Sequence, residues 1–263
     1  MTQSTGIQLV EKNGEHWYYV PELDKEVKSV TTYLKRIAKP HLIIWALKLA
    51  ANYLIDNFRV GMTLAEFKTL VATAVDIYNK TRDDAGDVGS RVHGIIDDFM
   101  KLVIAGQEPA DPMVMVKEEV DFRVVSCFRA FLDWYKKSGY RPIFSEKRQA
   151  SLIHEFAGTI DDAGIIGDKT VLMDLKSSNQ INDDYYLQVA AYVYMEEERD
   201  PDIRFDEAWI IRLGKNDGAF EARCIARKDI DFAFETFLAA KRLDSGLEQI
   251  KSINKVQKRV IEL

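Results

Sequence analysis

The sequence predicts an α/β fold: a mixed central sheet flanked by helices, with an N-terminal helical cap. Three observations predict it. Apolar residues recur at helical spacing through most of the first half, strand-like composition begins at Tyr140, and a helix then separates the first three strands from later ones. That order is typical of an α/β core. We expect residues 1–139 to be a mainly helical cap region and residues 140–263 to be the core, within one integrated domain.

The first half carries the start signals of several helices. A short helix is expected after a cap at Ser29 or Thr31. A second is expected over residues 41–58, and a third begins at Thr63, where Glu66 three residues on completes a capping-box pattern. Residues 83–104 favour a fourth helix entered through Gly86 and Gly89, and residues 117–137 favour a fifth. Almost the whole first half is therefore expected to be helical.

From Tyr140 onward, strand-like runs alternate with glycine turns and one helical segment. Gly164 and Gly167 are expected to turn the chain between the second and third strands, and Asp217-Gly218 is a hairpin signal between the last two. The expected elements are, in order, strands 141–150, 152–161 and 170–177, a helix at 182–198, strands 207–213 and 220–226, and a closing helix at 229–250.

Composition places the chain among soluble globular proteins, with 47% hydrophobic and 30% charged residues. The longest apolar run near the N-terminus, residues 42–51, is broken by Lys48 and is shorter than the roughly 20 residues that span a bilayer. Residues 1–14 lack the features of a secretory signal. We therefore expect an intracellular, cytoplasmic protein without a membrane partner.

Charge and cysteine content narrow the class further. A net charge of −6 argues against indiscriminate binding of polyanions, although a groove can still be locally basic. Cys127 and Cys224 fit a reducing compartment, and two cysteines are too few for a four-cysteine metal site. We expect both to be buried structural residues.

Two carboxylates and a lysine on neighbouring strands are the most informative feature of the chain. Asp174 and Lys176 are two residues apart on one expected strand, so both project to the same side of the sheet. An adjacent strand ending at Asp161 can bring a second carboxylate beside Asp174, and the two repel unless a cation neutralises them. Oxygen ligands suit Mg²⁺ or Mn²⁺ better than zinc. Taken alone, the triplet is also what an ordinary strand salt bridge looks like.

The order of residues around the triplet is more specific. Gly158-Thr159-Ile160-Asp161 is followed by a turn, by Asp174-Leu175-Lys176 and by a helix that carries Gln188 and Tyr192. This arrangement resembles the PD-(D/E)XK nuclease superfamily, and specifically its RecB-type exonuclease branch. Ile160 stands where the superfamily's name has proline.

Two upstream segments also match that branch. Gly89-Ser90-Arg91-Val92-His93 is similar to a segment whose histidine joins the metal shell. Lys28-Ser29-Val30-Thr31, followed later by Trp45, is similar to the N-terminal region of mitochondrial genome maintenance exonuclease and its phage relatives. The resemblance therefore implies a protein of a bacterial or phage-infected cell.

The resemblance implies a restriction-endonuclease-like core and a role for each matched residue. One or two Mg²⁺ or Mn²⁺ ions would be bound by His93, Asp161, Asp174 and the main-chain carbonyl of Leu175. The catalytic residues would be Lys176 as base or electrostatic helper, Glu146 holding a second metal or a water, and Gln188 with Tyr192 contacting phosphate and supporting Lys176.

Ordinary structural interpretations stand beside these roles. Glu146 could be an exposed strand carboxylate, His93 a core or surface histidine, and Gln188 with Tyr192 part of a helix face packed on the sheet. Asp162 is expected to be a turn carboxylate. Residues that could line a path for a nucleic-acid strand are Lys28, Lys35, Arg36, Lys39, Arg91, Lys147 and Arg148, with Tyr33 or Trp45 as a stacking partner.

The implied function is a metal-dependent DNA nuclease of repair, recombination or replication. An exonuclease that prefers single-stranded or free ends is expected, because the helical first half could arch over the strand. A recombination or replication protein is the other partner to expect. The alternatives are a structure-specific endonuclease and a nuclease-derived module that binds DNA without cutting. The sequence contains no P-loop, so it carries no helicase motor.

Overall fold

Five strands of the second half form the central sheet of the computed structural model, which describes residues 6–215 and 218–256. Their order in space follows their order in the chain, and β6 and β7 are parallel while the other neighbours are antiparallel. The strands are β4 (Arg141–Ser151), β5 (Phe156–Ile166), β6 (Lys169–Lys176), β7 (Glu207–Leu213) and β8 (Phe220–Ala226). The expected α/β fold with a mixed, helix-flanked sheet is confirmed.

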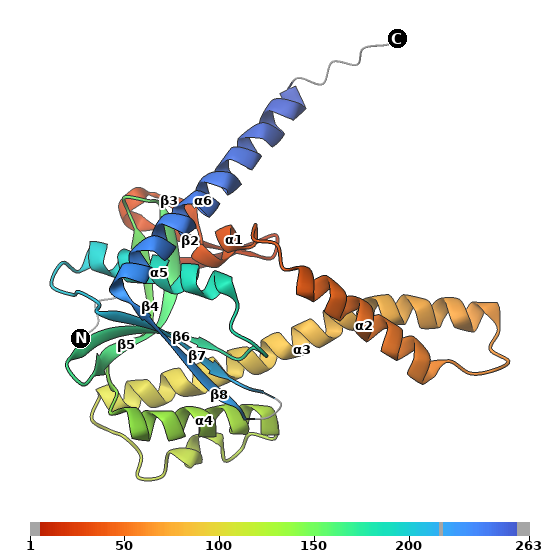
Figure 1. Cartoon of the computed structure of the whole chain (residues 1–263), viewed down its shortest axis with the longest axis horizontal. Coiled ribbons are helices and arrows are strands. Elements are labelled where there is room, and N and C mark those ends of the chain that lie inside the picture. Colours follow the sequence, from red (N-terminus) through yellow and green to blue (C-terminus); the bar gives the residue numbers. More distant parts are fainter. Residues whose placement is uncertain (1–5, 216–217, 257–263) are drawn as a thin grey trace.

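Helices cover both faces of this sheet (Figure 1). The crossover from β6 to the parallel β7 is α5 (Asp183–Arg199), which packs on one face together with α1 (Val30–Leu34) and α6 (Arg227–Val256). The other face is covered by α3 (Leu64–Ile104) and α4 (Phe122–Ser138), with the 3₁₀ turn η2 (Pro112–Val116) beside them. Each interface has its own fully buried apolar cluster, so the sheet is packed on both sides.

The helix α3 is one continuous element of 41 residues, which corrects the expectation of two helices there. The expected capping box of Thr63 and Glu66 is present at its start. Gly86 and Gly89 were expected to separate two helices, because each glycine costs a helix interior about 1 kcal/mol relative to alanine. They lie inside the helix instead, where Gly89 permits a close approach described below.

A small antiparallel sheet precedes the helices, and it was not expected from the sequence. Its strands are β1 (Gln8–Lys12), β2 (Glu15–Val20) and β3 (Lys25–Lys28), with the 3₁₀ turn η1 (Pro21–Leu23) between the last two. Tyr18, Val20 and Val27 are buried against Ala150 and Ala157 of the main sheet. The three strands pair with one another in antiparallel ladders, and most of their other side chains are at least partly exposed.

The helix α2 (Pro40–Asn57) and the first half of α3 form a two-helix arm that projects from the main body (Figure 1). Two edge-to-face aromatic contacts connect the helices, Trp45 with Tyr78 at 5.4 Å and Phe58 with Phe67 at 6.4 Å between ring centroids. The first half of α3 also buries Leu70 and Ala74, whereas no residue of α2 is buried.

Several boundaries and one cysteine differ from expectation. The turn between the first two strands lies at residues 152–155, and β5 continues through Gly164 to Ile166. Of the predicted hairpin residues, Asp217 lies outside the described residues. Cys127 is buried as expected, but Cys224 is exposed because it lies on the outer strand of the sheet. Among the described residues, no helix is long and apolar enough to cross a membrane.

Candidate metal and catalytic site

The site begins where β5 and β6 stop pairing. Their ladder runs from Ile166 opposite Lys169 to Asp162 opposite Met173, and the next positions along the two strands are Asp161 and Asp174. Asp161 then accepts a hydrogen bond from the backbone N–H of Leu175 on its Oδ2, at 2.7 Å. A carboxylate thus takes the place of a ladder carbonyl, which fixes Asp161 in the opening between the strands.

His93 reaches Asp161 from the opposite layer. It projects from α3, and its Nδ1 lies 3.5 Å from Asp161 Oδ1. Burial alone would lower the pKa of His93, but the charge of Asp161 and a hydrogen bond to it outweigh burial and raise that pKa. Burial would raise the pKa of Asp161, and the positive groups His93 and Lys176 hold it below its usual value. The two side chains therefore stabilise each other's charged forms.

Glu146 completes a group of three around Asp161. It lies on β4 between the pairs of Ser145 with Asp162 and of Lys147 with Ile160, which places it opposite Asp161. Its backbone has φ of 47°, a left-handed conformation that is unfavourable for a non-glycine residue and is often found at functional sites. Burial first, and then the charge of Asp161, raise the pKa of Glu146 to about 7.

Asp174 belongs to a second group, on the α5 side. Its Oδ2 lies 2.5 Å from Lys176 Nζ, and its Oδ1 accepts a hydrogen bond from Gln188 Nε2 at 3.0 Å. The same amide nitrogen donates to the hydroxyl of Tyr192 at 3.1 Å. Burial raises the pKa of Asp174 to about 6 in spite of the neighbouring lysine. Burial would lower the pKa of Lys176, but Asp174 and Asp161 outweigh it and raise that pKa.

Two glycines let helices approach this site closely. A Cβ on Gly158 would lie 2.5 Å from Tyr192 Cε1, so only glycine leaves room for the tyrosine ring over β5. A Cβ on Gly89 would lie 2.8 Å from Ser177 Oγ, so α3 crosses the end of β6 at minimal distance. Glycine in a helix interior is unfavourable by itself, and this contact gives it a physical reason.

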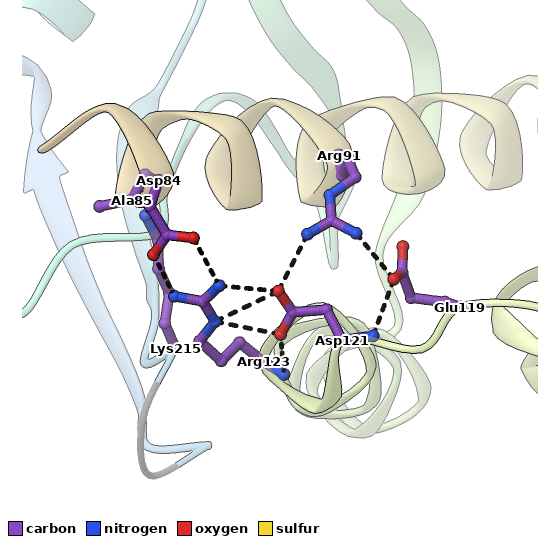
Figure 2. A network of polar contacts seen from close by, with 7 residues as sticks. All are labelled: Asp84, Ala85, Arg91, Glu119, Asp121, Arg123 and Lys215. Carbon is purple, nitrogen blue, oxygen red and sulfur yellow. Dashed lines mark hydrogen bonds and ion pairs between the residues drawn. The ribbon is translucent and has the colours of Figure 1, made fainter. Parts of the chain in front are cut away.

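A network of ion pairs fixes the part of α3 that carries His93 (Figure 2). Arg123 of α4 donates to Asp84 of α3 at 2.5 and 2.9 Å, and it also contacts Asp121. Arg91, two residues before His93, pairs with Asp121 at 2.9 Å and with Glu119 at 2.7 Å. Two arginines therefore hold the middle of α3 against the start of α4 on either side of Gly89.

Two cavities meet at Lys176. The larger, of about 1070 Å³, is lined by His93, Glu146 and Tyr192 as well as by Lys215 and Arg123. The smaller, of about 680 Å³, is lined by Lys35, Lys39 and apolar residues that precede or begin α2. Lys176, Tyr185 and Thr31 line both cavities. The helix α2 also lines both, the smaller through residues 40, 42 and 43 and the larger through residues 45 and 49.

The donor set fits a hard divalent cation. One ligand atom each of His93, Glu146 and Asp161 lies within 4.8 Å of the others. Asp174 Oδ2 is buried, and the ammonium of Lys176 lies 2.5 Å from it. Carboxylate oxygens with one imidazole suit Mn²⁺ or Mg²⁺. Among the described residues, His93, Glu146 and Asp161 are therefore the group that could share one cation.

Every residue given a metal-binding or catalytic role from the sequence lies near this point, but in two groups. His93, Glu146 and Asp161 are brought together, while Asp174 contacts Lys176 and Gln188 with Tyr192 behind them. Leu175 contributes its N–H to Asp161. The sequence reading missed Lys215, Arg123 and Tyr18, which also line the larger cavity. Tyr18 bonds Thr159 at 3.0 Å between hydroxyls, and no sequence pattern links the two.

Some expectations about neighbouring residues were wrong. Asp162 is a buried strand residue that accepts a hydrogen bond from the Tyr140 hydroxyl, not a turn carboxylate. Tyr33 is packed in the apolar core and is not available for stacking, whereas Trp45 does line the larger cavity. Of the basic residues suggested for a strand path, several are committed to ion pairs elsewhere: Lys28, Arg36, Arg91 and Lys147.

Comparison with known proteins gives limited similarity. The sequence matches no protein-family model and no curated protein. The structure is similar to that of an alkaline exonuclease from Laribacter hongkongensis, with 14% sequence identity and a TM-score of 0.30. The matched region covers 62% of this chain and 92% of the exonuclease chain. The structure titled SSO0001 is 8% identical, covering 48% of this chain and 65% of that one, slightly under two thirds, at a TM-score of 0.27. The chemistry must therefore follow from this chain's own side chains.

Proposed function

We propose that this chain is a metal-dependent nuclease with a restriction-endonuclease-like core that hydrolyses phosphodiester bonds of DNA. The observation that supports this best is the opening between β5 and β6, where Asp161 and Asp174 follow the last paired residues. Around it lie Glu146, His93 and the buried Lys176. Buried acids without enough positive partners, next to a lysine and a large cavity, suit the binding of a cation and a phosphate.

Each residue of the candidate site would have its own role in cleavage. Asp161, Glu146 and His93 would hold one Mg²⁺ or Mn²⁺ ion, with Asp174 available on the other side of Asp161. Such an ion supplies charge stabilisation to the phosphate and lowers the pKa of a bound water. Lys176 would place an ammonium beside the scissile phosphate, where it offsets developing charge or orients the attacking water. Gln188 would keep Asp174 in position, and Tyr192 would keep Gln188 in position.

We further propose an exonuclease that takes single-stranded ends. The support is the position of α2, whose residues line both cavities next to Lys176. A strand that lies in both would pass beneath this helix, and an end can enter there more readily than a closed duplex. Circular and linear single strands of the same sequence, incubated with Mn²⁺, test this: cutting of the circle would contradict the need for an end.

The site itself is tested by Asp174→Ala and Lys176→Ala. Both should lose cleavage of end-labelled DNA in Mg²⁺ or Mn²⁺ while keeping the wild-type circular dichroism spectrum. Asp168→Ala is the matched control, because Asp168 is exposed in the turn before β6. Retained cleavage by either purified site variant contradicts the proposed mechanism.

Cation binding is measurable without any substrate. Calorimetry with Mn²⁺ should show binding to the wild-type chain and a loss in His93→Ala and Glu146→Ala. Wild-type protein that binds no Mn²⁺ and cuts no DNA would favour a module that only holds nucleic acid.

A further inference from the structure

The parallel strands β6 and β7 end at the same edge of the sheet, next to the larger cavity. Lys176 of β6 pairs with Arg212 of β7, so the segments that follow the two strands lie next to each other. Ser177 and Lys215 belong to these segments, and both line the larger cavity. Ligands of open α/β sheets commonly bind outside the carboxyl ends of the strands. Neither residue has a role in the cleavage chemistry described above.

Ser177 and Lys215 approach the same point of α3. A Cβ on Gly89 would lie 2.8 Å from Ser177 Oγ and 3.8 Å from Lys215 Nζ. Hydrogen bonds join heavy atoms about 2.7 to 3.2 Å apart, so two donors this close together can contact different oxygens of one phosphate group. Gly89 lines the same cavity, so both donors lie at its wall beside a residue without a side chain.

The ammonium of Lys215 has no carboxylate partner in the described part of the chain. It donates a hydrogen bond to the main-chain carbonyl of Ala85, a group without net charge (Figure 2). Asp84, the neighbouring acid in α3, is paired with Arg123 instead. Burial has the largest effect on the pKa of Lys215 and lowers it. An anion bound beside this ammonium would offset the cost of its burial.

The hydroxyl of Ser177 is also available to a ligand. Within residues 6–215 and 218–256 it forms no hydrogen bond, whereas the next hydroxyl, that of Ser178, donates to the carbonyl of Gln180 at 2.7 Å. Asn179 follows in the same loop, is exposed and also lines the larger cavity. A positive charge and a neutral donor thus meet at one wall of the cavity.

We propose that Ser177 and Lys215 bind a phosphate group of the nucleic-acid strand, next to the phosphate that is cleaved. The inference rests on the proposed function, which places the cleaved phosphate at Lys176. Lys176 lies toward α5, with its Nζ 5.0 Å from the centroid of the Tyr185 ring, whereas Ser177 lies toward α3. The strand would therefore cross the end of β6 from the α3 side, in the larger cavity, toward the smaller one.

A purely structural role explains Lys215 less well. Such a role would be to fasten the segment after β7 to α3 through Ala85. The helix is continuous there, so the carbonyl of residue 85 already accepts the N–H of residue 89. The bond from Lys215 is therefore not needed to satisfy a buried acceptor, and it leaves the positive charge of the lysine without a counterion.

Binding of a short fluorescent single strand tests the proposal. Anisotropy is measured in EDTA, so that metal-dependent cleavage does not interfere. Lys215→Gln should weaken binding about 10-fold, and Ser177→Ala about 2- to 5-fold. Lys215→Gln should also lower the slope of log K against log salt by about 0.7, the share of one phosphate contact in a single strand. Lys137→Gln is the matched control, because Lys137 is exposed on α4 and lines neither cavity.

Uncharged methylphosphonate groups, placed at each position of the strand in turn, locate the contact. One position, next to the bond that the wild type cuts in Mn²⁺, should weaken wild-type binding about 10-fold and should have no effect in Lys215→Gln. A purely structural role for Lys215 would leave the pattern of sensitive positions the same in both proteins.

The same pattern of sensitive positions in both proteins overturns the proposal. Unchanged binding by Lys215→Gln also overturns it, as does a wild type that binds no single strand. Cleavage in Mn²⁺ is measured separately on the wild type. A chain that cuts DNA without this coupling loses only the Ser177 and Lys215 site, whereas a chain that binds the strand but never cuts it contradicts the proposed function.

Discussion

The sheet with its two helical layers and the α2–α3 arm are both rich in apolar residues, yet these residues are buried in the first and largely exposed in the second. In the body, apolar side chains such as Phe128, Phe131 and Phe156 are fully buried. In the arm, α2 has no buried residue, and Ile55 and Val60 are largely exposed. The body can hold a site at fixed geometry by itself. The arm lines the cavities of that site but buries few of its own side chains.

The largest expected effect comes from shortening one side chain to alanine in the body and one in the arm. Phe131→Ala should lower the free energy of unfolding by about 3 to 5 kcal/mol, because it leaves a cavity in a packed cluster. Ile55→Ala should change it by less than about 0.5 kcal/mol, since Ile55 is exposed. Urea unfolding at concentrations where the chain is monomeric measures both. Equal effects would mean that the arm is as well packed as the body.

A glycine substitution tests how tightly the body holds the site. Gly158→Ala should cost about 1 to 3 kcal/mol, because the new Cβ would meet the ring of the buried Tyr192. Cleavage should fall as well, since Tyr192 supports Gln188. Gly246→Ala is the control: nothing lies within 4 Å of its Cβ position in α6, so it should stabilise by about 0.5 to 1 kcal/mol. Thermal unfolding and a cleavage assay separate the two effects.

The support of Asp174 by α5 gives a smaller effect that is confined to activity. Gln188→Ala should lower cleavage by about 10- to 100-fold, the usual cost of removing a residue that orients a ligand of the site. Gln188→Glu keeps the size but places a second carboxylate 3.0 Å from Asp174, so it should fare no better. Steady-state kinetics with linear single-stranded DNA measures the change. Unchanged kcat in Gln188→Ala would show that Asp174 needs no support from α5.

The smallest expected effect concerns the start of α3 in the arm. Glu66 accepts hydrogen bonds from the Thr63 side chain and N–H, which lower its pKa. Because the pKa of Glu66 is lowered in the folded state, its ionised carboxylate stabilises the fold at pH values above the unfolded-state pKa of about 4.3. This stabilisation is lost as the pH falls through the folded-state pKa. The amide resonances of Thr63 and Glu66 should titrate with a midpoint below about 4.3. Glu66→Gln should abolish that titration, and a midpoint above this value contradicts the cap.

Much of the body could be predicted because its signals are local. The helix α5 and strands β6 to β8 lie within a residue or two of their expected positions, since each combines a clear periodicity with a turn signal at its ends. The Asp174 and Lys176 pair follows from strand alternation alone. Capping by Ser29 and by Thr63 was likewise readable, because it depends on residues three positions apart.

The expectations from the sequence were wrong where a contact with a distant segment outweighs the local preference of the chain. Gly89 lies in a continuous helix because α3 crosses Ser177, which is 88 positions away. Asp162 stays in a strand because β4 pairs with it and Tyr140 bonds it. The strands β1 to β3 exist because the main sheet covers their inner face. None of these contacts leaves a periodic trace in the nearby sequence.

By itself the sequence determined the α/β class, the positions of most helices and strands of the body, and the identity of the residues that could carry chemistry. Only the tertiary structure decided which of them meet. It placed Glu146 and His93 at Asp161 and Gln188 at Asp174, and it left every residue of α2 without a buried position. The physical reason is range: capping and periodicity act over a few residues, while burial and the pairing of charges depend on segments brought together by the fold.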